Sequence, residues 1–68
     1  MKKVHFNPQL SVSDNFIVNR FGTLDDDYSK GWQNRFNKGM DYALGCMDFD
    51  SLEVFQQTVE SYIAYLKS

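Results

Sequence analysis

The sequence has little of the material that small domains use to reinforce a fold. It holds one cysteine and one histidine in 68 residues, so an internal disulfide and a four-ligand zinc site of Cys and His are both excluded. A chain of this length buries only about 60% of the surface that its unfolded form exposes. Stability must therefore come from the apolar core or from self-association. We expect one small domain over residues 1–68, with an N-terminal arm and short element in 1–24 and a helical unit in 25–68.

Long apolar runs and export signals are missing too. No stretch approaches the roughly 18 consecutive apolar residues of a membrane span, and Met1, Lys2 and Lys3 lead into a polar stretch instead of an apolar signal core. No Asn begins a glycosylation triplet, and a lone thiol suits a reducing compartment. We expect a cytoplasmic protein that does not contact membranes.

Catalytic and metal-binding patterns are equally scarce. His5 and Cys46 belong to different segments, and no phosphate-binding loop, dinucleotide fingerprint or nucleophile elbow is present. The acidic run at 25–27 starts like a calcium loop, but Lys30 stands where the loop needs Gly and Phe36 where it needs a bidentate Glu. We expect no catalytic residue, no metal site, no cofactor and no enzymatic activity.

Apolar residues recur at helical spacing over residues 25–47, which predicts a long amphipathic helix. Thr23 with Asp26 three positions later marks its start. Gly39 is placed on the apolar face, where a small residue would let a second helix approach closely. The residues of this apolar face are Tyr28, Trp32, Phe36, Gly39, Met40, Ala43, Cys46 and Met47.

A second helix is predicted over residues 51–67, because Asp50 and Glu53 have the spacing of a capping box. The short connection between the two helices predicts an antiparallel helical hairpin (about 25–47 and 51–67). The main apolar stripe of the second helix contains Leu52, Phe55, Val59, Tyr62, Ile63 and Leu66.

The first 24 residues allow two interpretations. Val4 to Phe6 suggests an extended N-terminal arm, and Pro8 stops any helix before it. The β-branched residues within 16–21 favour a strand, whereas Ser13 as N-cap and Gly22 as C-cap favour a short helix. We predict the helix and hence an all-α fold. The alternative is an α+β fold with an N-terminal β-hairpin.

After the hairpin has packed, apolar side chains remain on its two flanks, and these predict a protein-binding surface. The residues are Tyr42, Leu44, Val54, Thr58 and Tyr65. The same flanks could instead pair two copies into a homodimer with four helices. Aromatic residues make up 16% of the chain. They either fill a small core that favours bulky residues or leave a surplus that faces a partner, since Tyr and Trp dominate interface energetics.

A basic face on the first long helix offers an alternative partner, nucleic acid. Its residues are Lys30, Asn34, Arg35 and Lys38. The net charge of -2 and an acidic C-terminal third argue against it, because phosphate neutralisation needs a basic surface.

These features predict a small non-enzymatic protein-binding module that regulates or inhibits a larger protein by occupying its surface. In size and in its lack of catalytic groups, the chain resembles the small accessory proteins with which phages and mobile elements modulate host machinery. The alternatives are a DNA-binding regulator and a structural subunit of an assembly.

Overall fold

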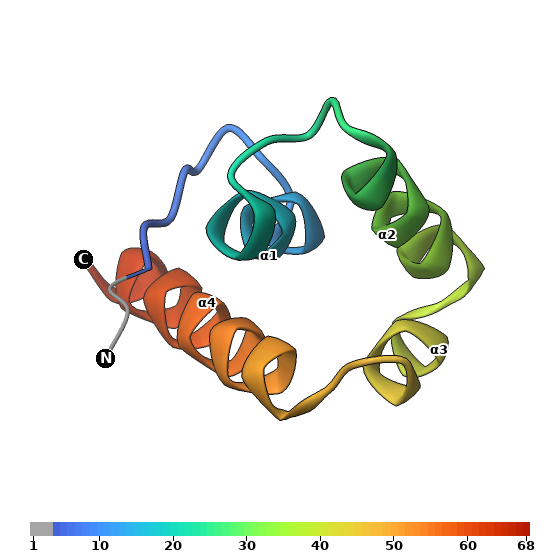
Figure 1. Cartoon of the computed structure of the whole chain (residues 1–68). Coiled ribbons are helices and arrows are strands. Elements are labelled where there is room, and N and C mark those ends of the chain that lie inside the picture. The colour runs from blue at the N-terminus through green and yellow to red at the C-terminus, as the bar shows by residue number, and fades with distance from the viewer. Residues whose placement is uncertain (1–3) are drawn as a thin grey trace.

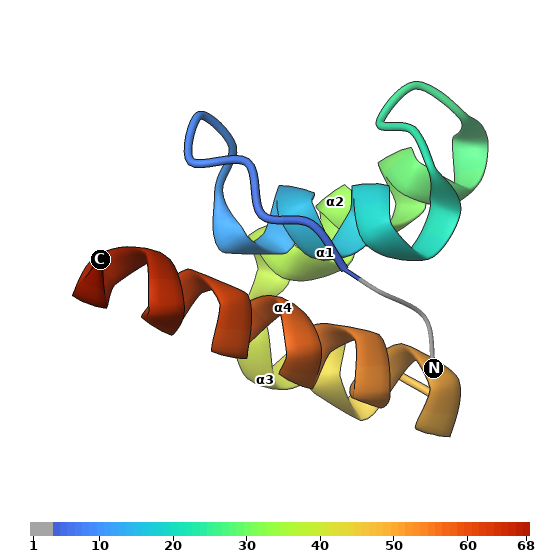
Figure 2. The ribbon, with the colours of Figure 1, turned by 90° about the vertical axis from the view of Figure 1, so that its left-hand side faces the viewer.

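The computed structural model describes residues 4–68, which fold into four helices and contain no strand. Figure 1 shows the helices around a common centre, and Figure 2 shows α1 and α2 lying above α3 and α4. The predicted all-α class is confirmed, and the alternative with an N-terminal β-hairpin is not supported. Part of the predicted arm, residues 1–3, lies outside the described residues. The helices are α1 (Val12–Phe21), α2 (Asp27–Lys38), α3 (Met40–Gly45) and α4 (Phe49–Lys67).

Helix α1 is the short helix predicted in the N-terminal third. Gly22 ends it in the left-handed conformation (φ 89°), and its backbone N–H donates to the Val18 carbonyl at 2.8 Å. The N-cap is Ser11, whose hydroxyl accepts a hydrogen bond from the Asp14 backbone N–H at 3.1 Å. The predicted N-cap, Ser13, instead lies inside α1. The predicted C-cap is confirmed, and the helix begins earlier than expected.

The prediction of a single helix over residues 25–47 is wrong, because the helix is interrupted at Gly39. Gly39 has φ 147° and ψ 148°, which ends α2 and starts α3 in a new direction. A Cβ atom built at Gly39 would meet nothing within 4 Å. The backbone conformation at this position therefore requires glycine. The prediction that a second helix approaches closely at Gly39 is also wrong, because no neighbouring atom lies there. Helix α2 begins at Asp27 after the N-cap Asp26, and not near Thr23.

Helix α4 matches the helix predicted over residues 51–67 closely. Its N-cap is Asp48, whose carboxylate accepts from the Ser51 backbone N–H at 2.8 Å, and not Asp50 as predicted. Helix α4 packs chiefly against α1, which also contacts α2. The predicted antiparallel hairpin is not confirmed, because α1 takes the place against α4 that the long helix 25–47 was expected to fill.

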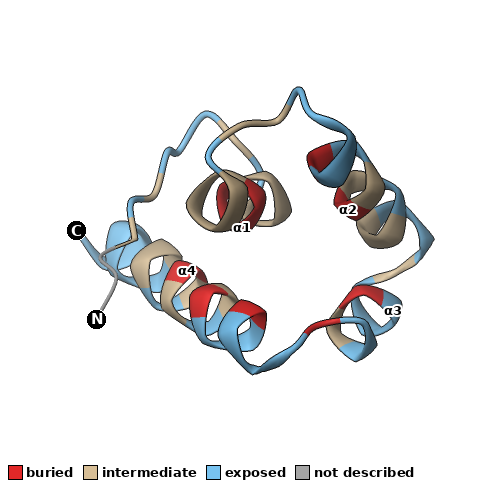
Figure 3. Ribbon diagram, in the orientation of Figure 1, coloured by how far each residue is buried: buried red, intermediate tan, exposed pale blue. Residues whose placement is uncertain are grey.

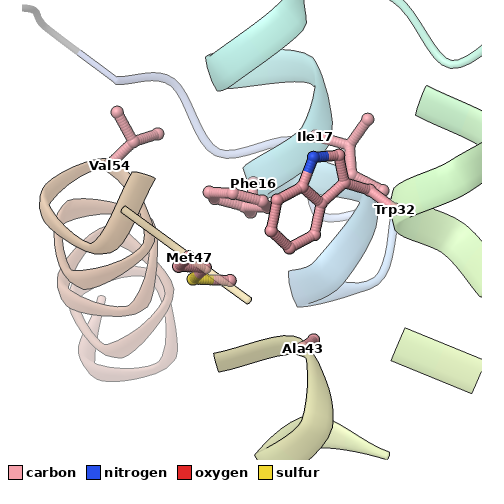
Figure 4. Close-up of a cluster of buried hydrophobic side chains, with 6 residues drawn as sticks. All are labelled: Phe16, Ile17, Trp32, Ala43, Met47 and Val54. Atoms are coloured by element: carbon pink, nitrogen blue, oxygen red, sulfur yellow. The ribbon is translucent and has the colours of Figure 1, made fainter. Parts of the chain in front are cut away.

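The core lies where α1 meets the other helices. Phe16 and Ile17 of α1 are fully buried, and Figure 4 shows them beside Trp32 of α2. The Phe16 ring makes edge-to-face contacts with Trp32, Phe36 and Phe55 at centroid distances of 5.6, 5.8 and 5.7 Å. The buried apolar residues are Phe16, Ile17, Trp32, Ala43, Met47 and Val54. Figure 3 shows that the buried positions of each helix face this centre.

Candidate binding surfaces

Two of the five residues predicted to bind a partner are buried. Thr58 is 0% exposed, and Val54 belongs to the core. The Thr58 hydroxyl donates to the Val54 carbonyl at 2.8 Å and accepts from Asn19 Nδ2 of α1 at 3.2 Å. The prediction that Val54 and Thr58 lie on an open flank is wrong, because α4 turns this flank toward α1.

The other three predicted residues contact different parts of the chain. Tyr65 is half exposed, and its ring lies 5.6 Å from the Phe6 ring of the N-terminal segment. Tyr42 is also half exposed, with Lys38 Nζ 5.3 Å from its ring centroid. Leu44 packs partly buried against the core. Within residues 4–68 no ring contact joins the two tyrosines, and each of them contacts a different segment of the chain.

An apolar line on α4 is exposed instead, and we call it the α4 stripe. At 100° per residue its members fall within an arc of about 60°, and they extend about 21 Å along the helix. Leu66 is 60% exposed, Ile63 44% and Leu52 38%. These residues were predicted to pack inside a hairpin, and they remain exposed because α1 covers the neighbouring flank. The α4 stripe consists of Leu52, Val59, Ile63 and Leu66.

The predicted basic face of α2 is partly used by contacts within the chain. The Arg35 guanidinium carbon lies 4.6 Å from the Trp32 ring centroid, and Lys38 lies over Tyr42. Lys30 and Asn34 are exposed. The four residues thus lie on one helix, but Arg35 and Lys38 each lie over a ring of the chain itself.

A hollow of about 260 Å³ lies between the end of α1, helix α2 and the start of α4. We call it the arginine hollow, because Arg20 and Arg35 both line it. The Arg20 guanidinium carbon lies 5.3 Å from the Phe21 ring centroid, and its Nε donates to Ser51 Oγ at 3.2 Å. The remaining lining residues are Phe21, Tyr28, Trp32, Cys46, Asp48 and Ser51.

The sequence contained no signal for this hollow. Arg20 and Ser51 are 31 residues apart, and only the packing of α4 on α1 brings them together. Arg35 was predicted as part of an exposed basic face. Helical periodicity places its Cα on that face, but it does not reveal that the side chain lies over the Trp32 ring.

Two capping carboxylates have shifted pKa values. The backbone N–H of Ser51 donates to Asp48 and lowers the pKa of that carboxyl, with a second contribution from the Ser51 side chain. The Ser29 backbone N–H lowers the pKa of Asp26 in the same way. Both carboxylates are engaged at helix N-termini, where negative charge is favoured. Their negative charge therefore stabilises the N-termini of α2 and α4.

Neither a metal centre nor a membrane span is found in the described part of the chain. Over residues 4–68, no three side chains of His, Cys, Asp or Glu gather closely enough to hold a metal ion. Each helix in this range is too short or too polar to cross a membrane. His5 and Cys46 are both exposed.

Comparison with known proteins gives no relative from which a function could be transferred. No family model matches the chain, and no curated protein and no solved structure matches it either, so its function has to be inferred from its own residues.

Proposed function

We propose that this chain is a non-enzymatic protein-binding module that regulates or inhibits a larger protein by covering part of its surface. The α4 stripe carries the proposal. Three large aliphatic side chains, Leu52, Ile63 and Leu66, are exposed in one line on the longest helix. Each square ångström of apolar surface that leaves water contributes about 25 cal/mol. A line of such side chains therefore favours binding to a complementary apolar surface.

The shape of the stripe favours an amphipathic helix as the partner segment. A straight apolar line on one helix matches the apolar face of another, as in the pairing of helices in a coiled coil. Residues 48–68 carry four acidic side chains and one basic one. The partner segment is therefore expected to have basic residues beside its apolar face. We place this interaction in the cytoplasm, where the exposed Cys46 thiol would stay reduced.

A defined peptide tests the stripe directly. The probe is a fluorescein-labelled amphipathic helix of Leu and Lys residues, titrated with the full chain and followed by fluorescence anisotropy. Ile63→Glu is expected to weaken binding at least tenfold, which corresponds to about 1.4 kcal/mol. The matched control is Ala64→Glu, which adds the same charge at the next exposed position, on the other side of α4. Equal loss in both variants would show that the stripe is not the binding surface.

A second copy of the chain is the competing occupant. Light scattering over a concentration series distinguishes the two, because a dimer has twice the mass of the 8.0 kDa chain. The proposal predicts a monomer. A dimer that Ile63→Glu dissociates and Ala64→Glu does not would assign the stripe to self-association and overturn the proposal. Proteins captured from the source cells by the wild-type chain are then compared with those captured by Ile63→Glu, Ala64→Glu and Lys38→Glu. Loss of a captured partner with Lys38→Glu alone would favour the basic face of α2.

A further inference from the structure

Arg20 and Arg35 both line the arginine hollow, and most of their guanidinium donors are unused. The bond from Arg20 Nε to Ser51 Oγ, at 3.2 Å, is the one hydrogen bond that either group makes within residues 4–68. A guanidinium presents several N–H donors in a fixed fork that matches a carboxylate. Nearly all donors of Arg20 and Arg35 therefore remain for a ligand.

Aromatic rings hold both guanidinium groups in place. Arg35 lies over Trp32 at 4.6 Å and Arg20 over Phe21 at 5.3 Å, measured from the guanidinium carbon to the ring centroid. Such stacking restricts the side chains before a ligand arrives, and this lowers the entropy cost of binding. The two like charges beside one hollow are favoured further when an anion lies between them.

The charge of the lining favours a single negative charge. Asp48 also lines the hollow, and its carboxylate remains engaged with the Ser51 backbone N–H as the N-cap of α4. Two positive side chains and one negative one leave a net charge that a monoanion balances. A phosphate dianion would be repelled by Asp48 more strongly than a carboxylate would.

The walls and size of the hollow favour an aromatic ring beside that charge. The Tyr28 ring lies nearly parallel to the Phe21 ring, with an interplanar angle of 16°, and the residue is 76% exposed, so it is accessible to another ring. The volume of about 260 Å³ is slightly below the range of about 300–1,000 Å³ for pockets that hold drug-sized ligands. One ring with its acid group is the size of ligand that such a hollow accepts.

We infer that the arginine hollow binds the carboxylate of an aromatic monocarboxylic acid. The carboxylate bridges Arg20 and Arg35, and the ring lies against Tyr28. The acid is either a small molecule or the C-terminal residue of a peptide that ends in an aromatic side chain. This site does not involve the α4 stripe, and either site can exist without the other.

Titration of the full chain with N-acetylphenylalanine tests the inference. Trp32 is the only tryptophan and lines the hollow, so its fluorescence reports on binding, and amide NMR shifts provide a second readout. The free acid is expected to bind at least tenfold more tightly than N-acetylphenylalanine amide, which lacks the charge. Inorganic phosphate is expected to bind at least tenfold more weakly than the free acid. A short peptide ending in Phe, with a free C-terminus, identifies the source: tighter binding than the single residue indicates a peptide terminus, and weaker binding a small acid.

Variants assign the effect to the guanidinium groups. Arg35→Gln is expected to weaken binding of the acid at least tenfold, and Arg35→Lys, which keeps the charge and loses the fork, by a smaller factor. The matched control is Lys30→Gln, which removes one exposed positive charge from the same helix and is expected to change the affinity less than twofold. Circular dichroism confirms that each variant is folded, and Arg35→Lys serves as the test if Arg35→Gln unfolds. Equal binding of acid and amide, equal binding of phosphate, or equal effects of the Arg35 and Lys30 variants would each overturn the inference.

Discussion

Asn15 and Asn7 form a reciprocal pair that fixes the N-terminal segment on α1. The Asn7 backbone N–H donates to Asn15 Oδ1 at 2.7 Å, and Asn15 Nδ2 donates to the Asn7 carbonyl at 2.9 Å. The same amide nitrogen also lies within hydrogen-bond distance of the Leu10 and Ser11 carbonyls. Asn15 is almost fully buried, so one side chain satisfies the backbone of a turn that has no regular secondary structure of its own.

Replacement of Asn15 is therefore expected to destabilise the protein strongly. Asn15→Ala removes the acceptor of the Asn7 backbone N–H and the donor to the Asn7, Leu10 and Ser11 carbonyls, at about 0.5–1.5 kcal/mol for each hydrogen bond lost. Asn15→Asp keeps the shape but turns an oxygen toward three carbonyls, and at pH 7 we expect it to be at least as destabilising. Urea unfolding followed by circular dichroism measures both. The control is Asn34→Ala, an exposed position on α2, where a change within about 0.5 kcal/mol is expected. A similarly small effect at Asn15 would contradict the role of this pair.

The ring of Phe16 is expected to be the most sensitive core position. It is fully buried and contacts three other rings edge to face. Phe16→Ala is expected to cost about 3–5 kcal/mol, a large part of the stability available to a small domain. The same substitution at the largely exposed Tyr28 is expected to have a much smaller effect. The melting temperatures of the two variants, measured by thermal unfolding, give the comparison. Similar melting temperatures would show that Phe16 does not lie at the centre of the core.

Glycine substitutions are expected to act in opposite directions at two positions. Gly39 has φ 147°, a conformation that residues with a side chain rarely adopt, so Gly39→Ala is expected to destabilise the junction of α2 and α3. Gly31 lies inside α2, and a Cβ there meets nothing within 4 Å. Gly31→Ala is therefore expected to stabilise the fold by up to about 1 kcal/mol. The urea concentration at the unfolding midpoint is expected to fall in Gly39→Ala and to rise in Gly31→Ala. A stabilising Gly39→Ala would indicate that α2 and α3 form one continuous helix.

Local signals in the sequence predicted the helices better than their packing. The left-handed C-cap at Gly22 and the periodicity of α4 were both visible, because they depend on residues within one or two turns. The break at Gly39 was missed, since helical periodicity continues across residues 25–47 and glycine is allowed within a helix at a cost of about 1 kcal/mol. Whether a glycine interrupts a helix depends on the packing on both sides of it.

The surfaces were harder to predict than the helices for the same reason. The periodicity of α4 marks a wide apolar arc, but it does not show which part α1 will cover. The structure buries Thr58 and Val54 and leaves Ile63 and Leu66 exposed, so the packed face of α4 is rotated toward Val54 and Thr58 relative to the predicted one, while Phe55 still packs on the core. Thr58 can be buried because its hydroxyl bonds to the Val54 carbonyl of its own helix. Such a partner is invisible in a hydropathy pattern.

Stability is expected to fall in acid through the two capping carboxylates, Asp26 and Asp48. Backbone N–H groups hold the pKa of each below its ordinary value in the folded chain, whereas the unfolded chain has the ordinary pKa of about 3.9. The unfolded state therefore binds protons first as the pH falls. The stabilisation is complete above about pH 4 and is lost as the pH falls through the folded pKa.

Variants that keep the caps but remove their ionisation isolate this effect. Asn is as good an N-cap as Asp, so Asp48→Asn is expected to leave α4 formed at pH 7 while reducing the slope of the melting temperature against pH below about pH 4. The double variant with Asp26→Asn is expected to flatten the curve further, because each carboxylate accepts its own backbone N–H. Circular dichroism melts between pH 2 and 7 provide the measurement. An unchanged slope in the double variant would mean that protonation of other groups governs acid unfolding, since neither cap could then titrate.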